Sequence, residues 1–110
     1  MAGQAGAPGR LSLGDYLVSA TSANVYALNF ETKERYHRMA FTPQQTRDYL
    51  ARIELSQIAD GPVVRCPSDL VVEFHDAAGR LLGTLGFCQE HARFDASDGT
   101  FGGVRAARPY

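Results

Sequence analysis

The stretch RCPSDLVVEFHDAAGRLLGTLGFCQEH, Arg65 to His91, decides the fold. It contains two runs of apolar and β-forming residues, Leu70 to Phe74 and Leu81 to Phe87. The four residues from Asp76 to Gly79 lie between these runs and are typical of a type I turn, in which a final glycine can adopt a positive φ. The stretch therefore predicts a β-hairpin.

Two shorter stretches upstream predict a second strand pair. Val25 to Phe30 has the period-two alternation of a half-buried strand. The polar residues from Glu31 to Glu34 form a turn, after which the alternation resumes from Tyr36 to Phe41. Uninterrupted alternation places His37, Met39 and Phe41 on one face of an antiparallel pair.

The segment between the two strand pairs carries the helix signal. A helix is predicted from Pro43 to Ile58, because Thr42 is a good N-cap, proline suits the first helical position and Gln45 completes a capping box. Its apolar positions form a stripe that would face the core: Tyr49, Leu50, Ile53 and Ile58.

Together these elements predict an α+β fold. We expect an antiparallel sheet of about four or five strands, with one main helix packed on one face and the core order β-β-α-β-β. A short strand at each end is optional: one around Val104, and one within Leu11 to Leu17, which could equally form one helical turn. Residues 1–10 are expected to be a flexible leader, residues 11–95 a single domain and residues 96–110 a loop-rich tail.

Composition and charge exclude several classes of function. With 110 residues and a net charge of −1, the chain lacks the basic surplus of a general nucleic-acid binder. No apolar run approaches the roughly 18 residues that a membrane span requires. The N-terminus has no signal-peptide pattern, so the chain as written is expected to be cytoplasmic, or periplasmic or secreted if a signal peptide has been removed.

The two cysteines, Cys66 and Cys88, flank the predicted hairpin. If strand pairing starts at the turn, the residue numbers of two paired residues add up to about 155. Residue 66 then faces a position next to Cys88. This spacing allows a Cys66–Cys88 disulfide. It also allows a zinc site formed by Cys66, Cys88, His91 and His37, since thiolate and imidazole are preferred zinc ligands. Two unbonded thiols are the third reading, and a Cys88–His91 nucleophile pair has no recognisable partner groups.

A resemblance rests on residues 42–91. The helix start Thr-Pro-Gln-Gln, then Arg65-Cys66-Pro67, then Val-Val-Glu-Phe-His-Asp-x-x-Gly, and finally Gly86-Phe87-Cys88-x-x-His91 resemble a set of small bacterial proteins that are often exported or lipid-anchored. Those proteins carry a Cys-x-x-Cys where this chain has Cys88 and His91. The resemblance implies a fold and no defined activity, and His91 makes a redox dithiol at positions 88 and 91 impossible.

The remaining signals favour a non-enzymatic role. Arginine and tyrosine are enriched at protein interfaces, and these types cluster in the sequence around the second strand and the helix: Arg35, Tyr36, Arg38, Arg47, Tyr49 and Arg52. An open sheet also has an edge to which a partner or a second copy could add. We therefore expect no enzyme and no cofactor, but a protein-binding module of the inhibitor or immunity type. The alternative is a metal-binding or redox-responsive protein that uses Cys66, Cys88 and His91, with zinc as its cofactor.

Overall fold

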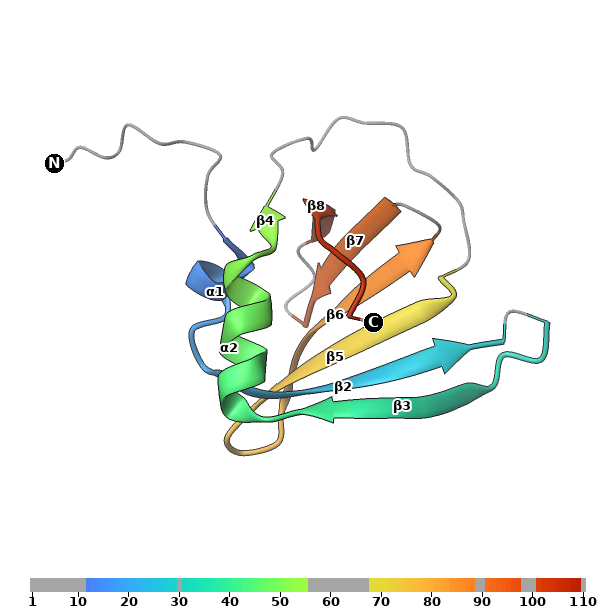
Figure 1. The fold of residues 1–110 in the computed structure, drawn as a ribbon, viewed down its shortest axis with the longest axis horizontal. Helices are drawn as coiled ribbons and strands as arrows, with labels where there is room; N and C mark the ends of the chain where they lie inside the picture. Colours follow the sequence, from blue (N-terminus) through green and yellow to red (C-terminus); the bar gives the residue numbers. More distant parts are fainter. Residues whose placement is uncertain (1–11, 30, 56–67, 89–90, 98–100, 110) are drawn as a thin grey trace, which may run out of the picture.

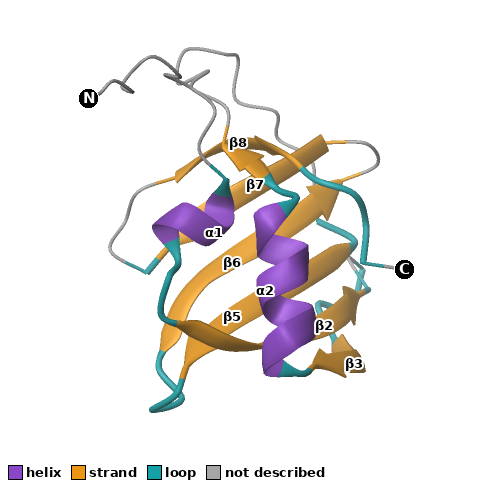
Figure 2. Cartoon of the chain, turned by 60° about the vertical axis from the view of Figure 1, so that its left-hand side comes forward, coloured by secondary structure: helices purple, strands orange, loops and turns teal. Residues whose placement is uncertain are grey.

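The computed structural model describes residues 12–29, 31–55, 68–88, 91–97 and 101–109, and these form two layers. One layer is an antiparallel sheet, and the other consists of α1 (Leu13–Tyr16) and α2 (Pro43–Ala51), which cover one face of that sheet (Figures 1 and 2). The strands are β2 (Ala20–Leu28), β3 (Arg35–Phe41), β4 (Glu54–Leu55), β5 (Leu70–Asp76), β6 (Leu81–Cys88), β7 (His91–Ala96) and β8 (Phe101–Arg105). The predicted α+β class with one main helix is confirmed.

The described strands follow the spatial order β3-β2-β5-β6-β7-β8-β4. The predicted hairpin is formed by β5 and β6, and the predicted strand pair by β2 and β3. Leu70 pairs with Phe87, so the partner numbers sum to 157 and not to about 155. The shift arises because the turn closes between Asp76 and Arg80, and a bulge adds one further residue in β6 next to the turn.

The core lies between the sheet and the helices. Val25, Val72, Leu85 and Phe94 stand in register across four neighbouring strands, and each is at most 4% exposed. Burying one such side chain stabilises the folded state by about 1.5–3 kcal/mol, so this row anchors the sheet to the helical layer. The helix supplies Tyr49 and Leu50, and Ile53 follows directly after its C-cap.

The helix α2 begins as predicted but ends earlier. Thr42 accepts a hydrogen bond from the Gln45 backbone, and the Gln45 side chain accepts one from the Thr42 backbone, so the capping box is present. The helix stops at Ala51, and the predicted end at Ile58 is wrong because Glu54 and Leu55 pair with β8 as strand β4. Ile58 itself lies outside the described residues, as does Phe30 at the predicted end of β2.

The C-terminal part of the chain has more strand than the sequence indicated. His91–Ala96 forms β7, which pairs along its length with β6, although no strand was expected there. The optional strand around Val104 is present as β8, within the segment expected to be a loop-rich tail. At the other end, Leu13–Tyr16 is a helical turn and not a strand. No helix within the described ranges is long and apolar enough to cross a membrane.

The Phe94 ring, which lies directly against Gly83, gives a test of this packing. A Cβ atom on Gly83 would lie 2.3 Å from Phe94 Cζ and 2.6 Å from Cε1, and Phe94 is itself buried. We therefore expect Gly83→Ala to lower the free energy of unfolding by about 1–3 kcal/mol, measured by urea denaturation. Gly14→Ala is the matched control, because its Cβ would meet no heavy atom closer than 3.5 Å. Equal stability of the two variants would contradict the packing described here.

Candidate functional site

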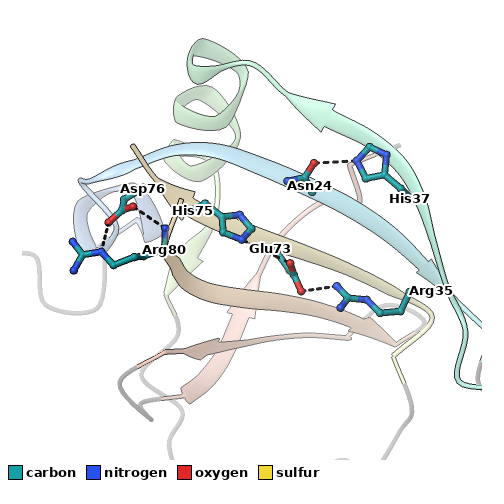
Figure 3. A network of polar contacts seen from close by, with 7 residues as sticks. All are labelled: Asn24, Arg35, His37, Glu73, His75, Asp76 and Arg80. Atoms are coloured by element: carbon teal, nitrogen blue, oxygen red, sulfur yellow. Dashed lines mark hydrogen bonds and ion pairs between the residues drawn. The ribbon is translucent and has the colours of Figure 1, made fainter. Parts of the chain in front are cut away.

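A polar network lies on the sheet face that the helices leave uncovered (Figure 3). Glu73 on β5 forms an ion pair with Arg35 on β3, and its other carboxylate oxygen lies 3.9 Å from His75 Nε2. The Arg35 guanidinium also lies 4.2 Å from the centroid of the Tyr26 ring on β2. Three strands are thus joined across this face by one arginine.

A second contact on the same face involves His37. Its Nε2 lies 3.0 Å from Asn24 Oδ1, and its ring packs edge-on against Tyr26 with 5.4 Å between centroids. The sequence placed His37 on the same face as Met39, and that expectation is wrong. Val25 pairs with Met39 but Tyr26 pairs with His37, so Arg38 is an extra residue that reverses the alternation within β3.

This network holds side chains in place but does not converge on a reactive centre. Arg35 and His37 on β3 are bound to Glu73 on β5 and to Asn24 on β2, and His75 lies beside Glu73 on the same strand. Within the described ranges, no group of three or more His, Cys, Asp or Glu side chains is arranged to hold a metal ion. We therefore treat the network as structural.

The turn of the β5–β6 hairpin contains a carboxylate that accepts three hydrogen bonds. The Asp76 side chain accepts hydrogen bonds from the backbone N–H groups of Ala78 and Arg80, both at 2.9 Å, and from Arg80 Nε at 3.0 Å. The Arg80 backbone N–H, more than the other donors, holds the pKa of Asp76 below its ordinary value of 3.8, although burial acts in the opposite direction. The carboxylate therefore fixes the turn as a charged group.

The predicted cysteine and zinc residues are only partly described. Cys88 is disulfide-bonded and pairs with His91 across β6 and β7. Cys66 lies outside the described residues, so the Cys66–Cys88 bond stays a prediction. His37 on β3 is separated from His91 by β2, β5 and β6, which is about 19 Å at the usual strand spacing. The described residues therefore do not bring His37 to Cys88 and His91.

The arginines and tyrosines proposed for partner binding fall on different parts of the molecule. Arg35 belongs to the polar network, whereas Tyr36 lies on the other face of β3, where it is 47% exposed. Arg47 is exposed on α2, and Arg52 is its C-cap residue. Tyr49 is only 6% exposed, and its hydroxyl donates a hydrogen bond to the Ala107 carbonyl at 2.8 Å. Tyr49 is thus mainly a core residue, with one side facing the pocket described next.

A pocket of about 380 Å³ lies between β3, α2 and the C-terminal segment Ala106 to Pro109. Its lining is Met39, Phe41, Gln45, Asp48, Tyr49, Arg52, Ile53, Ala107, Arg108 and Pro109. The apolar side consists mainly of side chains from β3 and the helix, with the Phe41 and Tyr49 rings packed edge-on at 5.4 Å. Its charged lining residues are Arg52, Arg108 and Asp48.

The C-terminal wall of this pocket is held by specific contacts. Arg108 forms an ion pair with Asp69 at 3.1 Å, and its guanidinium lies 5.5 Å from the centroid of the Phe87 ring. The hydrogen bond from Tyr49 to Ala107 ties the same segment to α2. Sequence reasoning named two residues of this lining, Tyr49 and Arg52, as partner-binding candidates. It missed the C-terminal wall because it treated residues 96–110 as a tail, and the bulge at Arg38 hid that Met39 and His37 lie on opposite faces.

Comparison with known proteins adds no assignment. No family model matches the chain, and no curated protein or solved structure shows significant similarity to it. The resemblance to small bacterial proteins with a Cys-x-x-Cys pattern therefore stays a prediction.

The hydrogen bonds of Asp76 predict a pH-dependent stability. Because the folded-state pKa of Asp76 is lowered, its contribution is fully present above its ordinary pKa and is lost as the pH falls through the folded-state value. Asp76→Asn should therefore unfold at lower urea concentration than the wild type at pH 7, and the difference should narrow below about pH 4. Asp95→Asn, which removes an exposed carboxylate paired with Arg93, is the control. A difference that stays constant down to acid pH would contradict the assignment.

A Cys66–Cys88 disulfide predicts a measurable difference in intact mass between the unreduced and the reduced chain. Under denaturing conditions without reductant, the intact chain should be lighter than the reduced chain by two hydrogen atoms, because Cys66 is the only partner within the chain for the disulfide-bonded Cys88. The double variant Cys66→Ser/Cys88→Ser should show no change on reduction. Free thiols together with a native mass heavier by one zinc ion would instead support the metal reading.

Proposed function

We propose that this chain is a non-enzymatic protein-binding module that receives an apolar anchor of its partner in the pocket between β3, α2 and the C-terminal segment. The observation that carries the proposal is the pocket lining. Methionine, tyrosine, phenylalanine and arginine are the residue types enriched at protein interfaces, and here they surround one concave site. Hot spots of binding energy form where such side chains create a pocket that excludes water.

The polar groups in the pocket suit binding better than catalysis. The Tyr49 hydroxyl donates to Ala107, and burial raises the pKa of Tyr49 well above its ordinary value. It therefore stays protonated and acts as a structural donor, not as a general acid or base. The Asp48 carboxylate accepts a hydrogen bond from Gln44, and the Asp48 carbonyl accepts one from Arg52 Nε. None of these contacts links a nucleophile to a base.

The rigidity of the pocket also supports a role in binding a partner, not in changing it chemically. A ring contact joins β3 to α2, a hydrogen bond joins α2 to the C-terminal segment, and an ion pair holds that segment to Asp69, directly before β5. A site ordered before binding loses little conformational entropy when the partner arrives. Rigid presentation of this kind is what an inhibitor or immunity-type protein requires in order to cover an enzyme surface.

Selection from displayed libraries of random peptides tests the proposal and requires no identified partner. We expect enriched sequences that carry an apolar anchor. Met39→Lys should weaken their binding by about tenfold or more, which corresponds to the roughly 1.4 kcal/mol or greater cost of truncating a hot-spot contact. The long aliphatic stem of lysine limits damage to the fold.

Thr84→Lys is the matched control, because Thr84 lies on the opposite, uncovered face between Glu73 and Asp95. It should leave the affinity of the selected peptides unchanged. If no selected peptide distinguishes Met39→Lys from Thr84→Lys, the pocket is not the binding site and the proposal is wrong.

A further inference from the structure

We propose that the partner element is an extended, acidic segment that adds as a strand to the edge of β3 and places one apolar side chain in the pocket. This inference rests on the proposed function and names the class of partner that the site takes.

The edge of β3 offers backbone groups for such a strand. β3 stands at one end of the order of described strands, so only its β2 side is paired among them (Figure 1). An edge strand presents a row of N–H and C=O groups, and extended peptides bind many proteins by completing this pairing. The hydrogen bonds supply affinity, and the side chains on alternate positions supply specificity.

The pocket lies within reach of a strand in that position. Met39 and Phe41 belong to β3 and line the pocket on the side of the helix layer. A strand added to β3 would run about 4.8 Å away. Each second side chain of this strand would then face the helix layer, beside Met39 and Phe41. One apolar side chain could therefore enter the pocket while the backbone pairs with β3.

Charge complementarity indicates that the segment is acidic. The segments around the pocket are β3, α2 with its C-cap, and the C-terminal segment. Together they contain one acidic residue, Asp48, and five arginines: Arg35, Arg38, Arg47, Arg52 and Arg108. Glu73 neutralises Arg35, and Asp69 pairs with Arg108. The other three arginines, Arg38, Arg47 and Arg52, outnumber the one acidic residue, Asp48. The segments around the pocket are therefore basic, although the net charge of the whole chain is −1. Complementary charge raises the association rate and selects against basic partners.

A second copy of the chain is a poor occupant of this edge. Two β3 strands paired about a two-fold axis at Arg38 would set the two Arg38 side chains opposite each other, and like charges at that position are destabilising. An acidic strand at the same position would meet Arg38 with attraction in place of repulsion.

A synthetic peptide in which glutamate alternates with valine or leucine tests the inference. The matched control replaces each glutamate with lysine. We expect the fluorescein-labelled glutamate peptide to bind the full chain at least about tenfold more tightly than the lysine peptide at low salt, measured by anisotropy, and the difference to shrink as salt is raised. Arg38→Glu should abolish the preference, because it leaves two arginines against two carboxylates, whereas Arg93→Glu, on β7 beyond three intervening strands, should not change it.

N-methylation of the peptide tests strand pairing without altering the protein. In an extended peptide the N–H groups alternate between two edges, so methyl groups on every second residue block one edge. One of the two singly blocked peptides should lose binding and the other should keep it. Equal affinity for glutamate and lysine peptides, tolerance of both methylation patterns, or a dimer formed through β3 would overturn the inference. If Met39→Lys still weakens the library-selected peptides in that case, the proposed function stands and only the acidic strand is wrong.

Discussion

The rest of the structure depends on the strict alternation of β5. Leu70, Val72 and Phe74 point to the helix layer and are at most 3% exposed, while Glu73 and His75 lie on the uncovered face. Because the side-chain period of a strand is two, a slip of one residue would exchange these sets and bury a carboxylate. The register of β2 and β6 on either side is therefore fixed by the cost of that exchange. Every other element is placed relative to these three strands.

The pocket follows from a mismatch in size between the two layers. At 1.5 Å per residue, the nine residues of α2 span about 14 Å. Seven strands at about 4.8 Å cover about 29 Å across the sheet. The helix alone cannot cover this face. α1 covers one part, and the C-terminal segment is tied down by Tyr49 and Arg108 on another. The pocket beside Met39 lies where a gap is left between α2 and the C-terminal segment.

What could be predicted from the sequence was local, and what escaped it depended on contacts distant in the chain. The β5–β6 hairpin and the start of α2 follow from turn residues and a capping box that act within four or five positions. The end of α2 has no glycine or proline nearby, so its limit is set by the pairing of Glu54 and Leu55 with β8. β7 was hidden because half of its buried positions are filled by Ala96 and not by a large apolar residue. The pocket needs residues about 70 positions apart, from Met39 to Pro109, and no local pattern indicates that they meet.

The bulge at Arg38 separates two roles within one strand. Before it, Arg35 and His37 face the uncovered side and are bound to Glu73 and Asn24, which ties β3 to the rest of the sheet. After it, Met39 turns to the opposite side and lines the pocket. Continuous alternation would have put His37 and Met39 on one face, leaving an imidazole in the apolar pocket or an apolar side chain within the polar network. One extra residue therefore lets the same seven-residue strand hold the sheet together on one face and line the pocket on the other.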